Sequence, residues 1–499
     1  MKKRMLITVM VILLICSAVL TLFSCDDGIK EPDDDIVVTR PTPNEYDLEG
    51  YTIKFAVCEG NNEESLVGRS ICPDENSGDS VDKAIIMRNK SIENRYNCNI
   101  EMSYYIANKN ISLTPKILSG SGDYDVLVGR QCDDISLCLN GALVDVVHHE
   151  DAAPYIDLEV DYPLVPDYWG YNYTYNISSN GNVYWLVGDI SMNFTGGLYC
   201  TFVNLAIYDD EFKKTEGSIY DLVRNREWTV DKVKMLADAA TTKKNITFDE
   251  LIVSEEYIGI AMPVNETMDA LAIAAGAKFC EIDQSGKAVC TANQNNAALR
   301  GFFDKYYEIL GSGSAINTGS DYKSAFAALA RDNALMTFGY LHQANTYLQN
   351  MTTPFYVLPM PMLNENQANY YTPVVKDIAL VGISSSSKNI KASAIVLDAM
   401  CKESYRSVRP YYYEKRLNFK YTTDLDFAEM MDLLVNTAYT DPVYAWSNTE
   451  YFDGVGEMIK NAFSSCSDAE SAIKTFPVSE KIWNDNLQTI MEKLSGKNN

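Results

Sequence analysis

The sequence predicts an α/β protein built around parallel sheets, and three features carry that prediction. From Tyr51 onward, apolar strand-like segments alternate with amphipathic helical segments. Tyr124–Gly129 (YDVLVG) is a short apolar run bounded by polar residues, as expected of a strand buried on both faces. A second alternating region begins near Asn193. Strand–helix–strand order of this kind is typical of parallel sheets.

The first region opens with a strand at Tyr51–Cys58, where apolar and polar residues alternate. Ser80–Tyr96 repeats Val81, Ala84, Ile85 and Ile92 at helical spacing. We expect a strand over 99–106, a short helical piece at 116–118 and the buried strand over 124–129.

In the second region Thr229 is the expected N-cap of a helix that runs through Ala240. Val357–Pro361 interrupts the strand pattern, because two prolines are not expected in a central strand. We expect strands at 258–262, 335–338 and 378–383, and helices at 268–275, 295–310, 392–401 and over most of the remainder to 499.

Length and charge narrow the class of protein. The chain has 499 residues, of which 46% are hydrophobic, so it holds more than one domain with sizeable cores. Its formal net charge is −26. The electric field of so much negative charge repels phosphates, so the charge argues against nucleic-acid binding.

The N-terminus has the pattern of a bacterial lipoprotein leader. Lys2, Lys3 and Arg4 precede an apolar run from Met5 to Phe23, and Ser24 and Cys25 follow it. The cysteine after 22–24 resembles a lipobox, in which it would be diacylated and become the new N-terminus. We therefore expect a signal peptide at 1–24 and lipidation at Cys25. The alternative is a permanent transmembrane helix, since an apolar run of about 20 residues spans a bilayer.

Residues 25–45 are expected to form an acidic tether. This segment combines many carboxylates with Pro32, Pro41 and Pro43 and has few apolar side chains, so it cannot build a core. The alternative is a short edge strand through 36–38.

Ten cysteines remain beyond Cys16 and Cys25. An even number in a secreted protein is compatible with disulfides. Cys280 and Cys290 flank a turn-like segment, 283–286, in an expected hairpin and are the best candidate pair. Buried thiols are the alternative, and the sequence does not decide between the two.

The order of segments resembles the extracellular solute-binding proteins of ABC sugar importers, family 1 type, over nearly the whole mature chain. The stretches that carry the likeness are Gly188-Asp189, Tyr199–Asp209 (YCTFVNLAIYD), Tyr220–Lys234 (YDLVRNREWTVDKVK), Ala334–Tyr340 (ALMTFGY), Phe355–Pro361 (FYVLPMP) and Tyr370–Ser384. The family's usual Asn-Lys is Asn204-Leu205 here, a departure expected to affect local packing.

The resemblance implies a two-lobe periplasmic-binding-protein-like fold, each lobe a mainly parallel sheet flanked by helices, joined by hinge crossovers near 190 and 358. Lobe 1 would comprise 46–190 and 360–405, and lobe 2 would comprise 191–358 and 406–499. The implied protein is a monomeric, lipid-anchored protein on the extracellular face of the cell membrane. It would bind a sugar between the lobes, deliver it to an ABC permease, need no cofactor and carry out no catalysis.

A sugar site needs aromatic rings for C–H faces and paired polar groups for hydroxyls. The chain supplies 33 Tyr and 5 Trp, and YWGYNYTY at 168–175 is rich in both kinds of group. Arg130 and Glu59 end strands, where open α/β sheets bind ligands. From residue type, position or family likeness we expect ligand contacts from Glu59, Arg130, Trp169, Asp189, Asn193, Tyr199, Tyr340, Tyr371, Asp377 and Trp446.

Other chemistry finds little support. His148-His149-Glu150-Asp151 has no second histidine pair to complete a metal site, and nucleophile-elbow, zinc-protease and phosphate-loop motifs are absent from the sequence. Two alternatives stay open: a binding protein for a non-sugar solute such as a peptide, and a lipid-anchored glycan-active hydrolase, whose carboxylate pair the sequence alone does not exclude.

Overall fold

The computed structural model describes residues 46–59, 67–106, 113–158, 168–178, 181–282, 288–293, 295–417, 425–447, 449, 451–452, 455–475 and 480–495. All of them belong to one compact unit, Arg40–Asn499. The predicted signal peptide, the predicted lipidation site Cys25 and the predicted tether lie outside the described residues.

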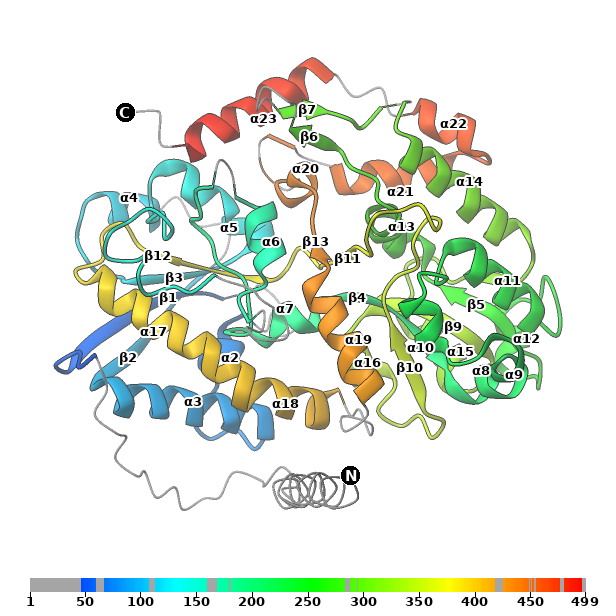
Figure 1. Cartoon of the computed structure of the whole chain (residues 1–499), viewed down its shortest axis with the longest axis horizontal. Helices are drawn as coiled ribbons and strands as arrows, with labels where there is room; N and C mark the ends of the chain where they lie inside the picture. Colours follow the sequence, from blue (N-terminus) through cyan, green and yellow to red (C-terminus); the bar gives the residue numbers. More distant parts are fainter. Residues whose placement is uncertain are drawn as a thin grey trace, which may run out of the picture. The chain divides into compact units, whose positions relative to one another are not determined.

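The first sheet has the strand order β12-β3-β1-β2 (Figure 1). Its strands are β1 (Tyr51–Glu59), β2 (Cys98–Ile106), β3 (Val126–Arg130) and β12 (Ala379–Ile383). β1 runs parallel to β2 and to β3, whereas β12 runs antiparallel to β3. The expected strands of the first region are thus confirmed.

Helices α3 (Ser80–Tyr96) and α17 (Ile390–Glu403) cover one face of this sheet and contact each other. The side chain of Asp79 caps α3 by accepting hydrogen bonds from the N–H groups of Val81 and Asp82. Val81, Ala84, Ile85 and Ile92 are buried, so the helical spacing seen in the sequence is the buried face of α3.

The second sheet has the order β10-β4-β9-β5-β8. Its strands are β4 (Tyr199–Asn204), β5 (Ile258–Met262), β8 (Ala315–Asn317), β9 (Ala334–Tyr340) and β10 (Phe355–Leu358). β5 is parallel to β8 and β9, whereas β4 is antiparallel to β9 and β10. Its larger helices are α11 (Val230–Ala240), α13 (Val264–Ala274), α14 (Ala297–Gly311) and α15 (Tyr322–Ala330).

Individual residues at the start of α11 and in β5 explain how α11 packs on the second sheet. Thr229 is its N-cap, as expected, and accepts a hydrogen bond from the N–H of Lys232. Gly259 in β5 lets the helix approach closely, because a Cβ there would lie 2.3 Å from the Cα of Ala237. The Trp228 indole donates to the carbonyl of Pro359 at 2.9 Å and so ties the start of α11 to the segment after β10.

The reversed strands β12 and β4 have a common cause. Each enters its sheet directly after the chain has crossed from the other lobe, and the crossing delivers it to the edge where the parallel strands end. It must therefore run opposite to them. Arg130 at the end of β3 pairs with Ala379 at the start of β12, and Tyr340 at the end of β9 pairs with Tyr199 at the start of β4.

Three segments connect the lobes side by side. Leu198 bridges to Val374, and β11 (Thr372–Pro373) runs parallel to β13 (Ala438–Tyr439). Gly188, at the start of the first crossing, approaches the carbonyl of Tyr168 so closely that a Cβ would lie 2.3 Å from it. Only glycine fits there.

The second and third crossovers do not lie at the positions near residues 358 and 405 that the predicted lobe bounds imply. After β10 the chain stays against the second lobe, where the carbonyl of Met362 accepts from Val230 and Gln367 donates to the carbonyl of Ala274. It crosses at about 372–378 instead. Beyond α17, two π-helical turns flank α18 (Arg409–Tyr411) and contact α3, so residue 405 lies inside a continuous helical segment.

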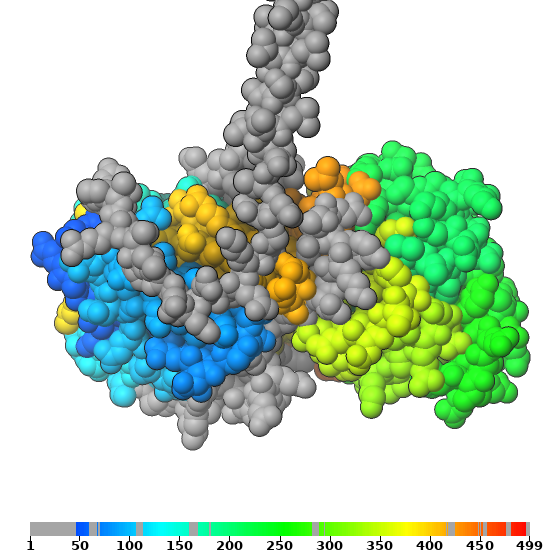
Figure 2. Space-filling model, turned by 90° about the horizontal axis from the view of Figure 1, so that it is seen from below, coloured from blue at the N-terminus to red at the C-terminus, as the bar shows by residue number. Residues whose placement is uncertain are grey.

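The C-terminal region is mostly helical, as expected. It contains α19 (Leu425–Asn436), α20 (Pro442–Ala445), α21 (Val455–Ser465), α22 (Ala469–Lys474) and α23 (Glu480–Leu494). α19 contacts β10, and in Figure 2 the blue surface around α3 and the yellow-green surface around β10 lie on opposite sides of the view. β6 (Cys280–Ile282) pairs antiparallel with β7 (Ala288–Cys290), which confirms the expected hairpin.

The remaining helices are short. They are α2 (Val67–Ile71), α4 (Leu113–Leu118), α5 (Gln131–Asp134), a 3₁₀ helix (Ile135–Asn140), α6 (Tyr171–Asn176), α7 (Met192–Gly196), α8 (Leu205–Glu211), α9 (Lys213–Glu216), α10 (Ile219–Arg224), α12 (Phe248–Ile252) and α16 (Gln343–Tyr347).

Candidate functional site at the crossovers

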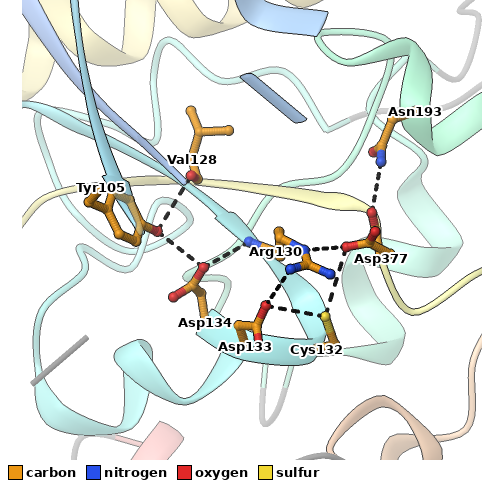
Figure 3. Close-up of polar contacts among 8 residues, drawn as sticks. All are labelled: Tyr105, Val128, Arg130, Cys132, Asp133, Asp134, Asn193 and Asp377. Atoms are coloured by element: carbon orange, nitrogen blue, oxygen red, sulfur yellow. Dashed lines mark hydrogen bonds and ion pairs between the residues drawn. The ribbon is translucent and has the colours of Figure 1, made fainter. Parts of the chain in front are cut away.

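Arg130 is the last residue of β3, and its guanidinium contacts two carboxylates (Figure 3). Nη1 lies 3.0 Å from Oδ2 of Asp133, and Nε donates to Oδ1 of Asp377. Asp133 belongs to α5, which follows β3 directly, whereas Asp377 precedes β12. Burial lowers the pKa of the guanidinium, but the bond to Asp377 and the neighbouring Asp133 raise it more, so its pKa ends above the ordinary value and the group stays charged.

Asn193 fixes the backbone on both sides of Asp377. Its Nδ2 donates to the carbonyl of Asp377 at 2.7 Å, and its Oδ1 accepts from the N–H of Ala379 at 2.7 Å. The side chain of Asp377 is 39% exposed, so its carboxylate retains hydrogen-bonding capacity beyond the bond to Arg130. We call Arg130, Asp133, Asn193 and Asp377 the crossover cluster.

A tyrosine pair lies at the matching edge of the second sheet. The rings of Tyr199 and Tyr340 meet edge to face with centroids 4.9 Å apart, and the ring of His342 stacks on Tyr340 at 5.8 Å. Tyr322 in α15 adds a third tyrosine, 6.1 Å from Tyr340. Burial raises the pKa of Tyr199 and of Tyr340 well above the ordinary value, so both remain protonated at neutral pH.

The structure adds residues that the sequence analysis missed. Nζ of Lys376 lies 3.8 Å from the ring centroid of Tyr444, and the hydroxyl of Tyr444 donates to Asp269. Burial lowers the pKa of Lys376 to about 8. Lys376 precedes a predicted site residue and Tyr444 lies two positions before Trp446, so adjacency was the signal available in the sequence.

Four predicted site residues are buried: Tyr199, which packs against Tyr340, and three that lie or pair elsewhere inside the protein. The Trp169 side chain is 2% exposed in the core of the first lobe, and its Nε1 donates to Asp398 at 3.1 Å. Asp189 pairs with Arg409, and Trp446 is buried in the core after α20. These residues were predicted to contact ligand. Their side chains instead pack or form ion pairs inside the protein, so the structure does not support those contacts.

Two predicted residues lie elsewhere. The ring of Tyr371 lies 4.8 Å from that of Tyr439, and both line a cavity of about 400 Å³ together with Asn172 and Asn176 of α6. Glu59 ends β1, as predicted, but its side chain lies outside the described part of the chain.

A larger cavity of about 1060 Å³ lies on the first lobe and is lined by residues that include Tyr155, Tyr171, Tyr175, Asp398 and Lys402. Its lining and that of the 400 Å³ cavity do not include Arg130 or the Tyr199–Tyr340 pair. The cluster and the tyrosine pair are therefore defined by their position at the two sheet edges rather than by either cavity.

The described residues hold neither a metal-binding cluster nor a membrane-spanning helix. Within them, no group of three or more His, Cys, Asp or Glu side chains is arranged to hold a metal ion. His148 binds Asp145 at 2.7 Å and is exposed. No helix of the described part has the length and apolar character needed to span a bilayer.

Sequence comparison finds no matching family model and no related curated protein. Comparison with solved structures does find proteins of similar fold. The chain is similar to the ABC substrate-binding protein of Listeria monocytogenes in complex with cycloalternan, with 13% identity, a TM-score of 0.51, and coverage of 89% of this chain and 99% of that one.

It is equally similar to the galacto-N-biose/lacto-N-biose I-binding protein of a Bifidobacterium longum ABC transporter in complex with lacto-N-biose, with 13% identity, a TM-score of 0.52 and coverage of 90% and 98%. A cyclo/maltodextrin-binding protein complexed with maltotetraose matches at 14% identity, a TM-score of 0.51 and coverage of 89% and 98%. The chain therefore has the two-lobe fold of the solute-binding proteins of ABC transporters, as the resemblance in its sequence predicted.

Proposed function

We propose that the chain is the substrate-binding lipoprotein of an ABC importer and that it captures a sugar, most simply an oligosaccharide, between its two lobes. The observation that carries this proposal is the presence of two kinds of group at the sheet edges where β12 and β4 enter. The crossover cluster offers charged donors and acceptors, and the partly buried Tyr340, which packs on the fully buried Tyr199, offers a ring with a protonated hydroxyl. Sugars need both, because a pyranose ring has apolar faces and a polar rim.

The fold supports capture by closure. Because the three crossing segments lie side by side, the lobes can rotate about them as a hinge, which is how binding proteins of this kind enclose ligands. The similar structures hold cycloalternan, lacto-N-biose and maltotetraose, so the same fold accommodates oligosaccharides in other proteins. Those proteins bind their ligands, and we propose binding without turnover here as well.

The sequence supports the cellular setting. The leader and Cys25 favour a lipid-anchored protein on the outer face of the membrane, with the acidic segment up to residue 45 as its tether. We propose that this anchored protein is a monomer and that it passes its sugar to a membrane permease. Globomycin-sensitive processing and labelling with radioactive palmitate test the anchor, and a Cys25→Ala variant that still incorporates palmitate would contradict it.

A thermal-shift screen of the leaderless protein tests the ligand class. A ligand that binds only the folded state raises the apparent Tm by mass action, by an amount that grows with its concentration over Kd. We expect a concentration-dependent rise with at least one mono- or oligosaccharide, and recovery of that sugar unchanged after incubation. A rise with peptides alone would favour the non-sugar solute, and shortened oligosaccharide products would favour a hydrolase.

A further inference from the structure

The β6–β7 hairpin places two cysteines directly opposite each other. Cys280 begins β6, Cys290 ends β7, and the two are register partners of the antiparallel pair. Both are buried, with 6% and 4% of their surface exposed, and both are thiols in the structure.

The hydrogen bonds show which kind of cross-strand pair this is. The N–H of Cys280 donates to Oδ2 of Asp441, and the N–H of Cys290 donates to Oδ1 of Asn484. The neighbouring pair is joined instead, because the N–H of Thr291 donates to the carbonyl of Phe279 at 2.9 Å. Cys280 and Cys290 are therefore a non-hydrogen-bonded pair, the type in which opposed Cα atoms approach to about 4.5 Å. That separation lies within the range that disulfides span, about 4.4–6.8 Å.

The hairpin also connects two parts of the fold. Asp441, at the start of α20, accepts from the N–H groups of Phe279 and Cys280, and Asn484 belongs to α23. The far end of α23 reaches the first lobe, where Asn182 and Tyr184 donate to the carbonyl of Leu494 at 2.6 and 3.0 Å. A fixed hairpin would thus hold one end of a helix that spans from the hairpin to the first lobe.

We propose that Cys280 and Cys290 form a cross-strand disulfide under oxidising conditions and that this bond braces the attachment of α23. The oxidant is a small-molecule or protein disulfide. One cysteine thiolate attacks it and releases the first thiol of the oxidant, and the second thiolate displaces the other. Two S–H bonds are lost, one S–S bond forms, and the oxidant becomes two thiols. This inference rests on the hairpin and is independent of the ligand.

Glutathione redox buffers test the pairing on the full chain. After equilibration, acid quenching, unfolding and alkylation without reductant, trypsin cleaves after Lys287 and separates the two cysteines onto different peptides. We expect a linked peptide pair, two hydrogen masses lighter than the sum, that disappears on reduction. Full alkylation of both cysteines after equilibration in oxidised glutathione overturns the proposal. Alkylation of Cys72 and Cys466 in the same sample shows that the reagent reached the unfolded chain.

A matched control moves the cysteines by one position. The control variant carries Cys280→Ala, Cys290→Ala, Glu281→Cys and Val289→Cys, so that its two cysteines occupy the next register pair of the hairpin. Hydrogen-bonded and non-hydrogen-bonded pairs alternate along an antiparallel ladder, so this pair is hydrogen-bonded and its Cα atoms lie further apart. We expect the natural pair to stay oxidised at a ratio of reduced to oxidised glutathione at least about tenfold higher than the moved pair tolerates. Equal ratios for the two pairs would show that register does not favour Cys280 and Cys290, and would also overturn the proposal.

A stability readout checks the bracing. Because a disulfide that closes a short loop stabilises the folded state, reduction should lower the Tm of the natural chain by roughly 2–4 °C. The single variants Cys280→Ala and Cys290→Ala should show no response to reductant. An unchanged Tm in a chain whose linked peptides are confirmed would refute the bracing role.

Discussion

Asp189 and Arg409 form an ion pair buried between the first crossover and the helical segment after α17. Oδ2 of Asp189 lies 3.3 Å from Nη1 of Arg409, and the two side chains are 2% and 6% exposed. Arg409 also donates to the hydroxyl of Tyr413 at 2.8 Å and lies 3.4 Å from Asp432. Asp189, which the sequence analysis expected to contact ligand, thus joins the first crossover to the helical segment after α17.

Replacing Asp189 with Asn should lower the free energy of unfolding by about 3 kcal/mol, because Arg409 would remain buried with a weaker partner. Urea denaturation of the ligand-free protein measures this. In Asp189→Leu/Arg409→Met both charges are removed, and this double variant should lose less stability than the single one. A single variant as stable as the parent would show that the pair contributes nothing.

If Arg130 binds ligand, Arg130→Ala should weaken sugar binding by roughly tenfold or more, because a charge-assisted hydrogen bond is lost and Asp377 is released. Isothermal titration with the sugar found by the thermal-shift screen measures the Kd. Arg300→Ala is the matched control, since Arg300 pairs with Glu470 on the exposed surface. Equal Kd values for parent and Arg130→Ala would remove Arg130 from the site.

Two substitutions test the contributions of the Tyr340 ring and of its hydroxyl to sugar binding separately. Tyr340→Ala removes a surface on which a sugar face would stack and should weaken binding by roughly ten- to a hundredfold, whereas Tyr340→Phe keeps the ring and should lose about tenfold or less. Comparable losses in both variants would mean that the hydroxyl rather than the ring is recognised.

Lys376 makes stability depend on pH. Its pKa is about 8 in the folded protein and 10.5 ordinarily, so between these values the unfolded chain binds more protons than the folded one. The free energy of unfolding should therefore rise as pH increases from 8 to 10.5. Subtracting the curve of Lys376→Met isolates this slope from the titration of tyrosines. A difference curve that is flat, or that falls with pH, would contradict it.

Asp441 accepts hydrogen bonds from the N–H groups of Phe279, Cys280 and Val443. An asparagine has only one acceptor oxygen, so Asp441→Asn leaves at least one of these buried N–H groups without a partner. We expect a loss of about 1–3 kcal/mol in urea unfolding. Asp468→Asn is a suitable control, because Asp468 caps α22 at the exposed surface; a loss of similar size there would argue against a special role for burial.

Much of the fold was predictable because its signals are local. The spacing of Val81, Ala84, Ile85 and Ile92, the cap at Thr229 and the apolar run before Arg130 each report on a few neighbouring residues, and all three matched the structure. The strand pairing that sets Cys280 opposite Cys290 matched for the same reason.

The site was less predictable because it depends on where the chain crosses. Arg130, Asn193 and Asp377 come together only because β12 enters the sheet beside β3, and their ligand contacts stay a prediction. Trp169 and Trp446 have the residue type of a sugar site, but indole rings also fill cores, and composition does not separate these roles. Lys376 and Tyr444 are 68 positions apart (444 − 376), so no local pattern links them.

Both hydrogen bonds of the Asn193 side chain go to main-chain atoms, the carbonyl of Asp377 and the N–H of Ala379. Every amino acid carries a carbonyl, so neither bond depends on which side chain stands at position 377. A substitution there would break the pair with Arg130 and change what the crossing presents to a solute, while both main-chain anchors persist.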